Sequence, residues 1–130
     1  MTDKQQNDIR IPEDPRKAQE LLLQLQRRKK LAGLIGIAKK AGRVIAGTNL
    51  VTDCIRSGSA SKCPYAVFLA SDVSENTRKR ITNCCSYYEV PLYDIPLTIA
   101  EVGDAIGKSG STAAVGITDA GLSDALVKLI

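Results

Sequence analysis

Tyr65-Ala-Val-Phe-Leu-Ala70 is the longest apolar run in this 130-residue chain. A short run of this kind predicts a strand that is buried on both faces. Asp72 and Ser74 follow the run and are residue types that cap helices, so we expect a helix from there to about Tyr88. A strand followed directly by a helix is therefore the unit from which the fold is built.

The same unit recurs on both sides of this stretch. Pro91 indicates that the first residue of the next strand lies at an edge of the sheet or at the entry of the strand. Thr98-Ile-Ala-Glu101 fits a capping box, in which two side chains satisfy free backbone N–H groups at the start of a helix. In all, we expect three further strands, at residues 43–46, 90–95 and 113–118, and three further helices, at residues 48–58, 98–107 and 119–129.

A helix precedes the first strand. Asp14-Pro15 is a helix-start signal, and apolar residues from Leu21 to Ala38 recur with the spacing of an amphipathic helix. The basic cluster Arg27-Arg-Lys-Lys30 interrupts the apolar stripe, so the pattern leaves open whether one helix or two are present. Residues 1–13 are polar and lack periodicity, and we expect a flexible tail there.

Alternation of strands and helices predicts an α/β fold. The length and the 44% hydrophobic content suit one domain with its own core. Because each crossover must return the chain across the sheet, the alternation favours a largely parallel sheet with helices on both faces. Strand order is not fixed by the pattern, and one strand can run antiparallel.

The cysteine and histidine content argues against an enzyme and against a metal site. The chain has no histidine, the commonest general base, and none of its cysteines stands in a C-x-x-C frame. We therefore expect no catalytic residues, no cofactor and no bound metal. The cysteines are expected to be reduced, mostly buried thiols, and they are Cys54, Cys63, Cys84 and Cys85.

The sequence favours a cytoplasmic protein. No segment approaches the roughly 18 consecutive apolar residues of a membrane span. Residues 1–10 are polar and of mixed charge, unlike a secretory signal. We expect neither a membrane partner nor a small-molecule substrate.

Positive charge is concentrated in the first part of the chain. Residues 1–80 hold sixteen Lys and Arg against eight Asp and Glu, whereas residues 81–130 hold two against six. No acidic residue lies between Leu21 and Thr52. Such a stretch suits a phosphate backbone, although a solvated helix face explains it equally well.

A stretch near residue 105 resembles a phosphate-binding loop but departs from it. Gly103-Asp-Ala-Ile-Gly107-Lys108 has three residues between its glycines where the motif needs four, and it ends a helix instead of opening one. Nucleotide hydrolysis is therefore not expected. Lys108 and the polar residues after it form either a loop beside a ligand or a simple surface connection.

A stronger candidate site is the junction Lys39-Lys-Ala-Gly-Arg-Val-Ile-Ala-Gly-Thr-Asn49. Cations lead into a short strand, and a glycine then turns the chain into a helix whose first N–H groups are free to attract an anion. A side-chain amide can bond base edges. The alternative is an ordinary strand-to-helix turn with Thr48 as its cap. With Lys108, the candidate RNA-binding residues are Lys39, Lys40, Arg43, Gly47, Thr48 and Asn49.

From Leu31 onward the chain resembles the ribosomal protein seven-Ae/thirty-e family, in particular its bacterial YlxQ group. The resemblance implies a three-layer α/β/α sandwich around a mixed four-stranded sheet, and binding of structured ribosomal or regulatory RNA, typically kink-turns. The stretches that carry it are Leu34-Ile-Gly-Ile-Ala-Lys-Lys-Ala-Gly-Arg43, Gly47 with Ile55-Arg-Ser-Gly58, Phe68-Leu-Ala-Ser-Asp72 with Ser74-Glu-Asn-Thr77, Cys85-Ser-Tyr-Tyr88 with Val90-Pro91, and Ala105-Ile-Gly-Lys108 with Ala114-Val-Gly-Ile-Thr-Asp119.

The chain departs from the family's RNA signature at two positions. Kink-turn readers of the family carry Gly-x-Asn-Glu and a lysine three residues later. Gly47 and Asn49 match, but Leu50 stands in place of the glutamate and Asp53 in place of the lysine. An acid facing phosphates opposes binding. A protein-interaction module that keeps the fold without RNA recognition is therefore the alternative function.

The resemblance also divides the chain in two. Residues 31–130 are expected to form the RNA-binding domain, and residues 1–30 a flexible tail and basic helical extension. The extension either adds phosphate contacts or serves only as a solubilising tail.

Overall fold

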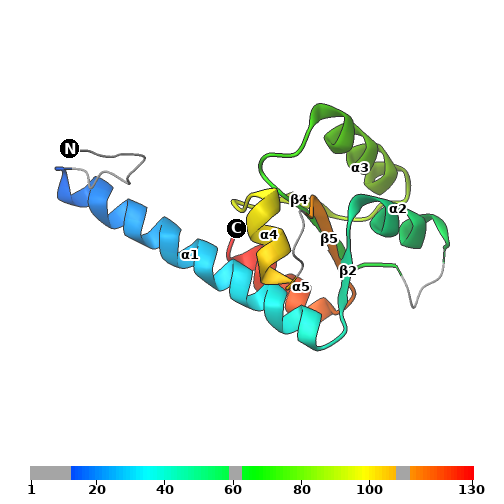
Figure 1. The fold of residues 1–130 in the computed structure, drawn as a ribbon, viewed down its shortest axis with the longest axis horizontal. Coiled ribbons are helices and arrows are strands. Elements are labelled where there is room, and N and C mark those ends of the chain that lie inside the picture. Colours follow the sequence, from blue (N-terminus) through cyan, green and yellow to red (C-terminus); the bar gives the residue numbers. More distant parts are fainter. Residues whose placement is uncertain (1–12, 59–62, 108–111) are drawn as a thin grey trace.

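The structure is a computed structural model that describes residues 13–58, 63–107 and 112–130 (Figure 1). Lys108 and all but the last residue of the expected flexible tail lie outside the described residues. The predicted order of one helix followed by four strand–helix units is confirmed. The elements are α1 (Pro15–Lys40), β2 (Val44–Ala46), α2 (Thr48–Arg56), β3 (Ala66–Leu69), α3 (Glu75–Tyr87), β4 (Leu92–Asp94), α4 (Ile99–Ala105), β5 (Ala114–Ile117) and α5 (Ala120–Lys128).

The four strands form one mixed sheet in the order β2-β5-β3-β4. β3 and β4 are parallel, but β5 lies between β2 and β3 and is antiparallel to both. β2, β3 and β4 thus run in one direction and β5 is the one antiparallel strand that the alternation left open, which confirms the mixed sheet implied by the family resemblance. The cause lies after α4, where the backbone N–H of Thr112 donates to the carbonyl of Ile99 at 3.3 Å. This contact brings the chain back to the edge where α4 began, so β5 starts there and runs the opposite way.

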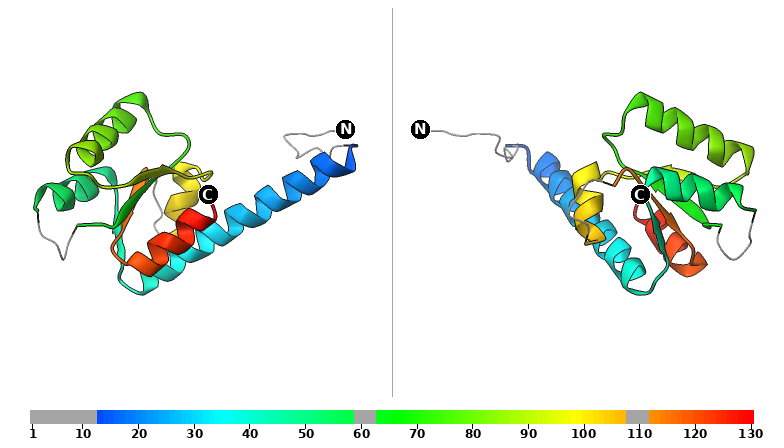
Figure 2. Two further views of the ribbon diagram at one scale, coloured as in Figure 1. Left: turned by 180° about the vertical axis from the view of Figure 1, so that it is seen from behind. Right: turned by 45° about the vertical axis from the view of Figure 1, so that its right-hand side comes forward.

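Helices cover both faces of the sheet, which gives three layers (Figure 2). β3 is buried along its whole length, as its apolar run predicts. Phe68 packs in the core beneath α1, α4 and α5, whereas Val67 and Leu69 pack in the core beneath α2 and α3. The alternating direction of side chains along a strand thus supplies both cores from one short segment. β4 lies at the edge of the sheet, which is one of the two positions that Pro91 indicated.

α1 is one continuous helix of 26 residues, which answers the question that the sequence left open. Its start is capped by Asp14, whose carboxylate accepts the N–H of Arg16 at 2.9 Å. At 1.5 Å per residue a helix of this length spans about 39 Å, and its N-terminal half extends beyond the sandwich (Figures 1 and 2). Among the described helices, none combines the length and the hydropathy that a membrane span requires.

Candidate nucleic-acid interface

Three helices begin at the same edge of the sheet. The registers pair Val115 with Ala46 and with Phe68, and Phe68 with Tyr93, so β2, β3 and β4 all run in one direction and end at one edge. α2, α3 and α4 follow these strands and therefore start there. The free N–H groups at a helix start carry partial positive charge. The starts of α3 and α4 are capped by Ser74 and by the Thr98–Glu101 capping box with Asp72, so α2 is the helix whose first amides remain available at this edge among the described residues.

The start of α2 borders a hollow of about 450 Å³ at this edge. Gly47 is the N-cap residue, with φ 100° and ψ 148°, and its N–H donates to the carbonyl of Ala114 at 2.9 Å. No side chain among the described residues caps α2, and Thr48 is its first residue instead of the cap of an ordinary turn. The first-turn amides are therefore left for another acceptor. We call this hollow the α2-start hollow; its lining residues are Ala46, Gly47, Thr48, Asn49, Leu50, Ile99, Thr112 and Ala113.

Thr112 adds a polar group to the α2-start hollow. Its side chain is only 2% exposed, and its hydroxyl has no hydrogen-bond partner among the described residues. Leaving a buried hydroxyl unpaired costs about 1–3 kcal/mol. Neither its burial nor its orphan hydroxyl is signalled by the sequence.

Asn49 is held by a residue that sequence reasoning missed. Arg80 of α3 donates from Nη2 to the side-chain oxygen of Asn49 at 2.7 Å. Because a guanidinium only donates, it fixes which end of the amide faces it and leaves the NH₂ group as the free donor. The run Arg78-Lys-Arg80 was the sequence signal for such a contact. Successive residues of a helix point about 100° apart, so three adjacent cations face different directions.

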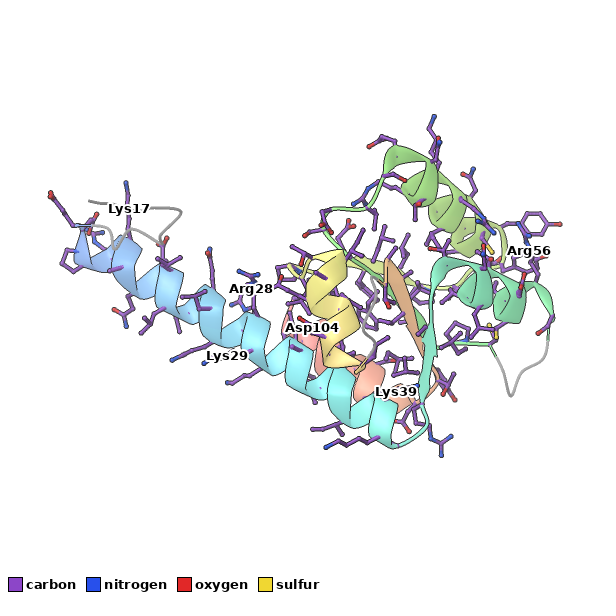
Figure 3. All side chains as sticks on the ribbon, in the orientation of Figure 1. Lys17, Arg28, Lys29, Lys39, Arg56 and Asp104 are labelled. Atoms are coloured by element: carbon purple, nitrogen blue, oxygen red, sulfur yellow. The ribbon has the colours of Figure 1, made fainter. Side chains whose placement is uncertain are left out.

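Lys39, Lys40 and Arg43 lie elsewhere. Lys39 and Lys40 form the last turn of α1, where cations complement the negative end of the helix. Arg43 precedes β2 and Gly47 follows it, so the strand separates them by about 13 Å at 3.3 Å per residue. In Figure 3, Lys39 marks this opposite end of the sheet. The expected gathering of these three cations around the start of α2 is therefore wrong.

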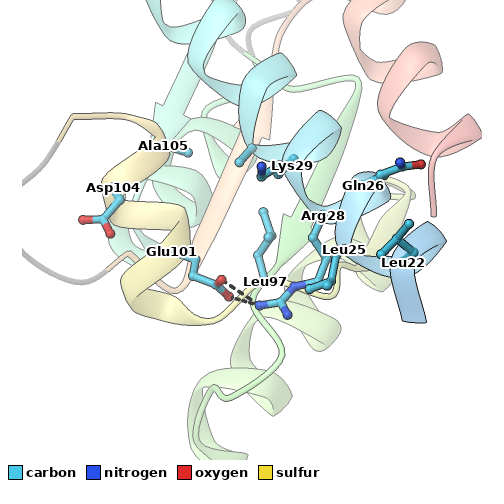
Figure 4. A pocket seen from close by; sticks show the side chains of 10 residues that line it. Leu22, Leu25, Gln26, Arg28, Lys29, Leu97, Glu101, Asp104 and Ala105 are labelled. Atoms are coloured by element: carbon cyan, nitrogen blue, oxygen red, sulfur yellow. Dashed lines mark hydrogen bonds and ion pairs between the residues drawn. The ribbon is translucent and has the colours of Figure 1, made fainter. Parts of the chain in front are cut away.

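The basic cluster Arg27–Lys30 of α1 lies nearer to the α2-start hollow. Arg28 Nη2 approaches both carboxylate oxygens of Glu101, at 2.7 and 2.6 Å (Figure 4). Glu101 belongs to the first turn of α4, whose first residue, Ile99, lines the α2-start hollow. Arg28 and Lys29 accordingly lie beside α4 (Figure 3). The extension thus brings positive charge to the edge where the helices begin.

Glu101 organises this junction. It accepts the backbone N–H of Thr98 at 2.9 Å, while the Thr98 hydroxyl accepts the N–H of Glu101 at 3.1 Å, which confirms the predicted capping box. The Thr98 N–H, and after it Arg28, lower the pKa of Glu101 below its usual range against the opposing effect of burial. Glu101 is therefore ionised at neutral pH and holds α1 against α4.

The two departures from the RNA signature lie on the exposed surface of α2. The side chain of Leu50 is 52% exposed, and Asp53 is exposed one turn after Asn49. Asn49, Asp53 and Arg56 are spaced four and three residues apart and share one face of α2. An apolar and an acidic residue thus flank the side-chain amide of Asn49.

The cysteines lie away from the α2-start hollow. Cys84 and Cys85 are buried, whereas Cys54 and Cys63 are half-buried, so the predicted burial holds for two of the four. Burial raises the pKa of the Cys85 thiol to about 11, with smaller contributions from Cys84 and Cys63. A thiol with this pKa is protonated at neutral pH and is a poor nucleophile.

A family model decides the relationship of the chain to known proteins. The ribosomal protein L7Ae/L30e/S12e/Gadd45 family matches residues 29–127. The chain belongs to this family. The resemblance to its YlxQ group is likewise confirmed, because the chain is 39% identical over 103 residues to the RNA-binding protein YlxQ of Enterococcus faecium, a match covering 79% of this chain and 93% of that protein.

Two further comparisons agree with this L7Ae-family membership. The RNA-binding protein YlxQ of Bacillus subtilis strain 168 is 36% identical over 97 residues, covering 75% of this chain and 91% of that protein. A solved structure, the 15.5kD RNA-binding protein of Giardia lamblia, superposes with a TM-score of 0.60 over 89% of this chain and 92% of that one. At 20% identity the latter comparison shows the shared fold.

Proposed function

We propose that this L7Ae-family protein binds structured, kink-turn-like RNA at the α2-start hollow and performs no chemistry of its own. The observation that carries the proposal is the start of α2, where the first-turn amides, which no described side chain caps, and the anchored Asn49 border one hollow. Backbone amides at a helix start bind phosphate, and the NH₂ group of an asparagine donates to base edges. The two YlxQ relatives, both named as RNA-binding proteins, support this choice of ligand.

Charge around the hollow supports RNA over a protein ligand. Arg80 bonds Asn49 from one face of the sandwich, and Arg28 of the basic cluster lies beside α4 on the other face, where it is paired with Glu101. Phosphate neutralisation by such cations supplies most of the salt-dependent affinity for a nucleic acid. Arg80 also offers a positive charge close to Asn49 where the family's signature lysine is replaced by Asp53.

The remaining parts of the proposal follow from the family. The target is a ribosomal or regulatory RNA in the cytoplasm, residues 31–130 form the RNA-binding domain, and residues 1–30 contribute cations to it. Of the residues expected from the sequence, Gly47, Thr48 and Asn49 form the proposed site, whereas Lys39, Lys40 and Arg43 lie at the other end of β2 and Lys108 lies outside the described residues. The high thiol pKa of Cys85 and the absence of histidine from the sequence support a non-catalytic role.

Gel-shift titration tests the proposal. The protein is titrated into a kink-turn RNA and into an unkinked duplex of the same composition, at 50 and at 200 mM salt. Tighter binding to the kink-turn, with affinity for both RNAs falling as salt rises, is the expected result. Failure to bind either RNA at the lower salt rules the proposal out.

Leu50 and Asp53 motivate a second candidate function, a protein-interaction module. Leu50 is a large apolar side chain left 52% exposed on α2, which suits a protein interface better than a phosphate backbone. A pull-down with the tagged chain, with and without nuclease, separates the two functions. A single protein partner retained after nuclease treatment favours this second function, and loss of all partners favours RNA binding.

A further inference from the structure

We infer that a second hollow, between α2 and α3, binds an unpaired nucleotide of the RNA by stacking its base on Tyr87. The inference rests on the proposed function and extends the RNA contact along α2 and α3. The hollow has a volume of about 430 Å³. We call it the tyrosine hollow; its lining residues are Arg56, Arg80, Asn83, Cys84, Tyr87 and Tyr88.

Tyr87 is the most exposed aromatic side chain of the described residues. Its side chain is 80% exposed, and Tyr88 beside it is 41% exposed. The two rings meet edge to face, with centroids 4.8 Å apart and planes at 75°. In an edge-to-face pair the two rings do not stack on each other, and with 80% of Tyr87 exposed much of its ring remains open. The ring of Tyr87 contributes little to the core and is suited to stacking with a base.

Cations and an amide surround this aromatic pair. Arg56 ends α2 and Arg80 lies two turns before Tyr87 on α3, so both line the tyrosine hollow from different helices. Guanidinium groups bind phosphate and stack on bases, and the Asn83 amide both donates to and accepts from a base edge. Recognition of single-stranded RNA uses a stacking surface, positive charge and a polar group that bonds base edges.

Arg78 and Arg80 of α3 differ in whether a carboxylate neutralises their charge. Arg78 Nη1 pairs with Asp94 at 2.7 Å and is directed toward β4. Arg80, in contrast, bonds the uncharged side chain of Asn49, so its positive charge is not neutralised by a carboxylate there. The positive charge of α3 is thus left for the ligand on the side that faces α2.

Arg80 joins the tyrosine hollow to the α2-start hollow. It lines the first and anchors Asn49 at the border of the second. α2 and α3 lie side by side, with Asn49 beside Arg80 at one end and Arg56 beside Tyr87 at the other (Figure 1). An RNA docked at the start of α2 can therefore continue along the two helices. Asp53, between Asn49 and Arg56, keeps phosphates to the α3 side of this path.

The test adds single-stranded extensions to the RNA. A two-stranded kink-turn has four strand ends, and four RNAs each carry three uridines at one of them, with the blunt RNA as reference. Equilibrium anisotropy is measured for the unmodified protein, Tyr87→Ala, Tyr87→Phe and, as a control, Tyr65→Ala. Tyr65 is also exposed, at 59%, but precedes β3 and does not line the tyrosine hollow.

At least one extended RNA should bind about tenfold more tightly than the blunt RNA, the order expected for one stacked base. Tyr87→Ala should abolish this gain and leave blunt affinity unchanged, while Tyr87→Phe and Tyr65→Ala should retain the gain. Equal binding of all five RNAs by the unmodified protein, or a gain that survives in Tyr87→Ala, overturns the inference and leaves the proposed function intact. Failure to bind any of the five RNAs overturns both.

Crosslinking gives an independent readout. With 5-iodouridine in the extension that binds most tightly, irradiation should attach the RNA to Tyr87 or Tyr88, as located by mass spectrometry. Crosslinks confined to α1 or α5 would contradict the inference.

Discussion

The orientation of the Asn49 side chain is fixed in the protein alone, and we therefore expect Asn49 to contribute more to the choice of RNA than its neighbours do. The 2.7 Å bond from Arg80 uses the acceptor of the amide and leaves its donor available. A side chain held in place gives up less rotamer freedom on binding than a free one. Discrimination between RNAs should therefore depend on this residue more than total affinity does.

Replacing Asn49 with alanine tests this dependence. We expect Asn49→Ala to reduce the preference for a kink-turn over an unkinked duplex by about tenfold, the loss typical of one base-edge contact. Affinity for the unkinked duplex should change little, because phosphate contacts remain. Paired binding titrations measure both quantities, and an equal loss for both RNAs would contradict the role in discrimination.

Gly47 is required by its backbone conformation. Its φ of 100° is unfavourable for any residue with a Cβ, so Gly47→Ala should lower the free energy of unfolding by about 1–3 kcal/mol. Gly33 is the matched control, since it lies within α1 with open space around its Cα and no positive φ. Gly33→Ala should raise stability by about 0.5–1 kcal/mol, because alanine is the better helix former. Urea unfolding checks both, and equal signs would contradict the argument.

Asp53 opposes the phosphates that the helix start attracts. Asp53→Lys should raise RNA affinity about tenfold at low salt and make its salt dependence steeper by about one unit. Asp124→Lys on α5 makes the same charge change on the other face of the sandwich and should have a smaller effect. Filter binding over a salt series distinguishes the two variants. A larger gain from Asp124→Lys would mean that RNA docks elsewhere.

At the scale of elements, the Arg28–Glu101 pair fixes how α1 lies against α4. Glu101→Gln removes the charge but keeps an acceptor for the capping box, so it isolates the ion pair. With 37% and 41% of the two side chains exposed, solvent screening limits the loss to about 1 kcal/mol or less at pH 7.

This loss should depend on pH. Because the folded-state pKa of Glu101 is lowered, its contribution is complete above the usual value of 4.5 and disappears as the pH falls through the lowered value. The unmodified protein and Glu101→Gln should therefore differ in stability at pH 7 and converge in acid. Urea unfolding at a series of pH values measures this, and a difference that does not shrink as the pH falls below 4.5 would exclude the charge of Glu101 as its cause.

Helices and strands were predictable from sequence where the residues that cause them lie within or next to them. Ser74, Thr98 and Asp119 cap the helices that they were expected to open. The apolar run at residues 65–70 predicted the buried strand β3. The direction of β5 was not predictable, because it depends on a tertiary contact between Thr112 and Ile99. The continuity of α1 was not predictable either, because Arg28 is bonded to Glu101, which lies 73 residues away in the sequence.

The candidate site was predictable only in part for the same reason. Gly47 and Asn49 stand together in sequence and in space, so the motif located the α2-start hollow. Arg80 and Thr112 reach it from other elements, and only the fold brings them there. Lys39, Lys40 and Arg43 are close to Gly47 in sequence but separated from it by the whole length of β2, because an extended strand carries the chain across the sheet.

At the scale of the whole molecule, two sources of positive potential meet at one edge. The sheet directs β2, β3 and β4 to the same edge, so the starts of three helices gather there. α1 then crosses beside α4 and brings the basic cluster Arg27–Lys30 to that edge. The opposite edge holds the ends of α1, α2 and α3, where Lys39 and Lys40 offset the negative helix ends. The start of α2 is therefore the side of the molecule at which we propose that anions bind.

Mapping the bound RNA by amide chemical shifts tests this central claim most directly. Two-dimensional ¹H–¹⁵N spectra of the labelled full chain are recorded during titration with a kink-turn RNA. The largest changes should fall on the amides of Gly47, Thr48, Asn49 and Leu50, followed by Ile99, Thr112 and Ala113. Changes concentrated on α5 or on residues 39–43, with the first turn of α2 unaffected, would contradict it.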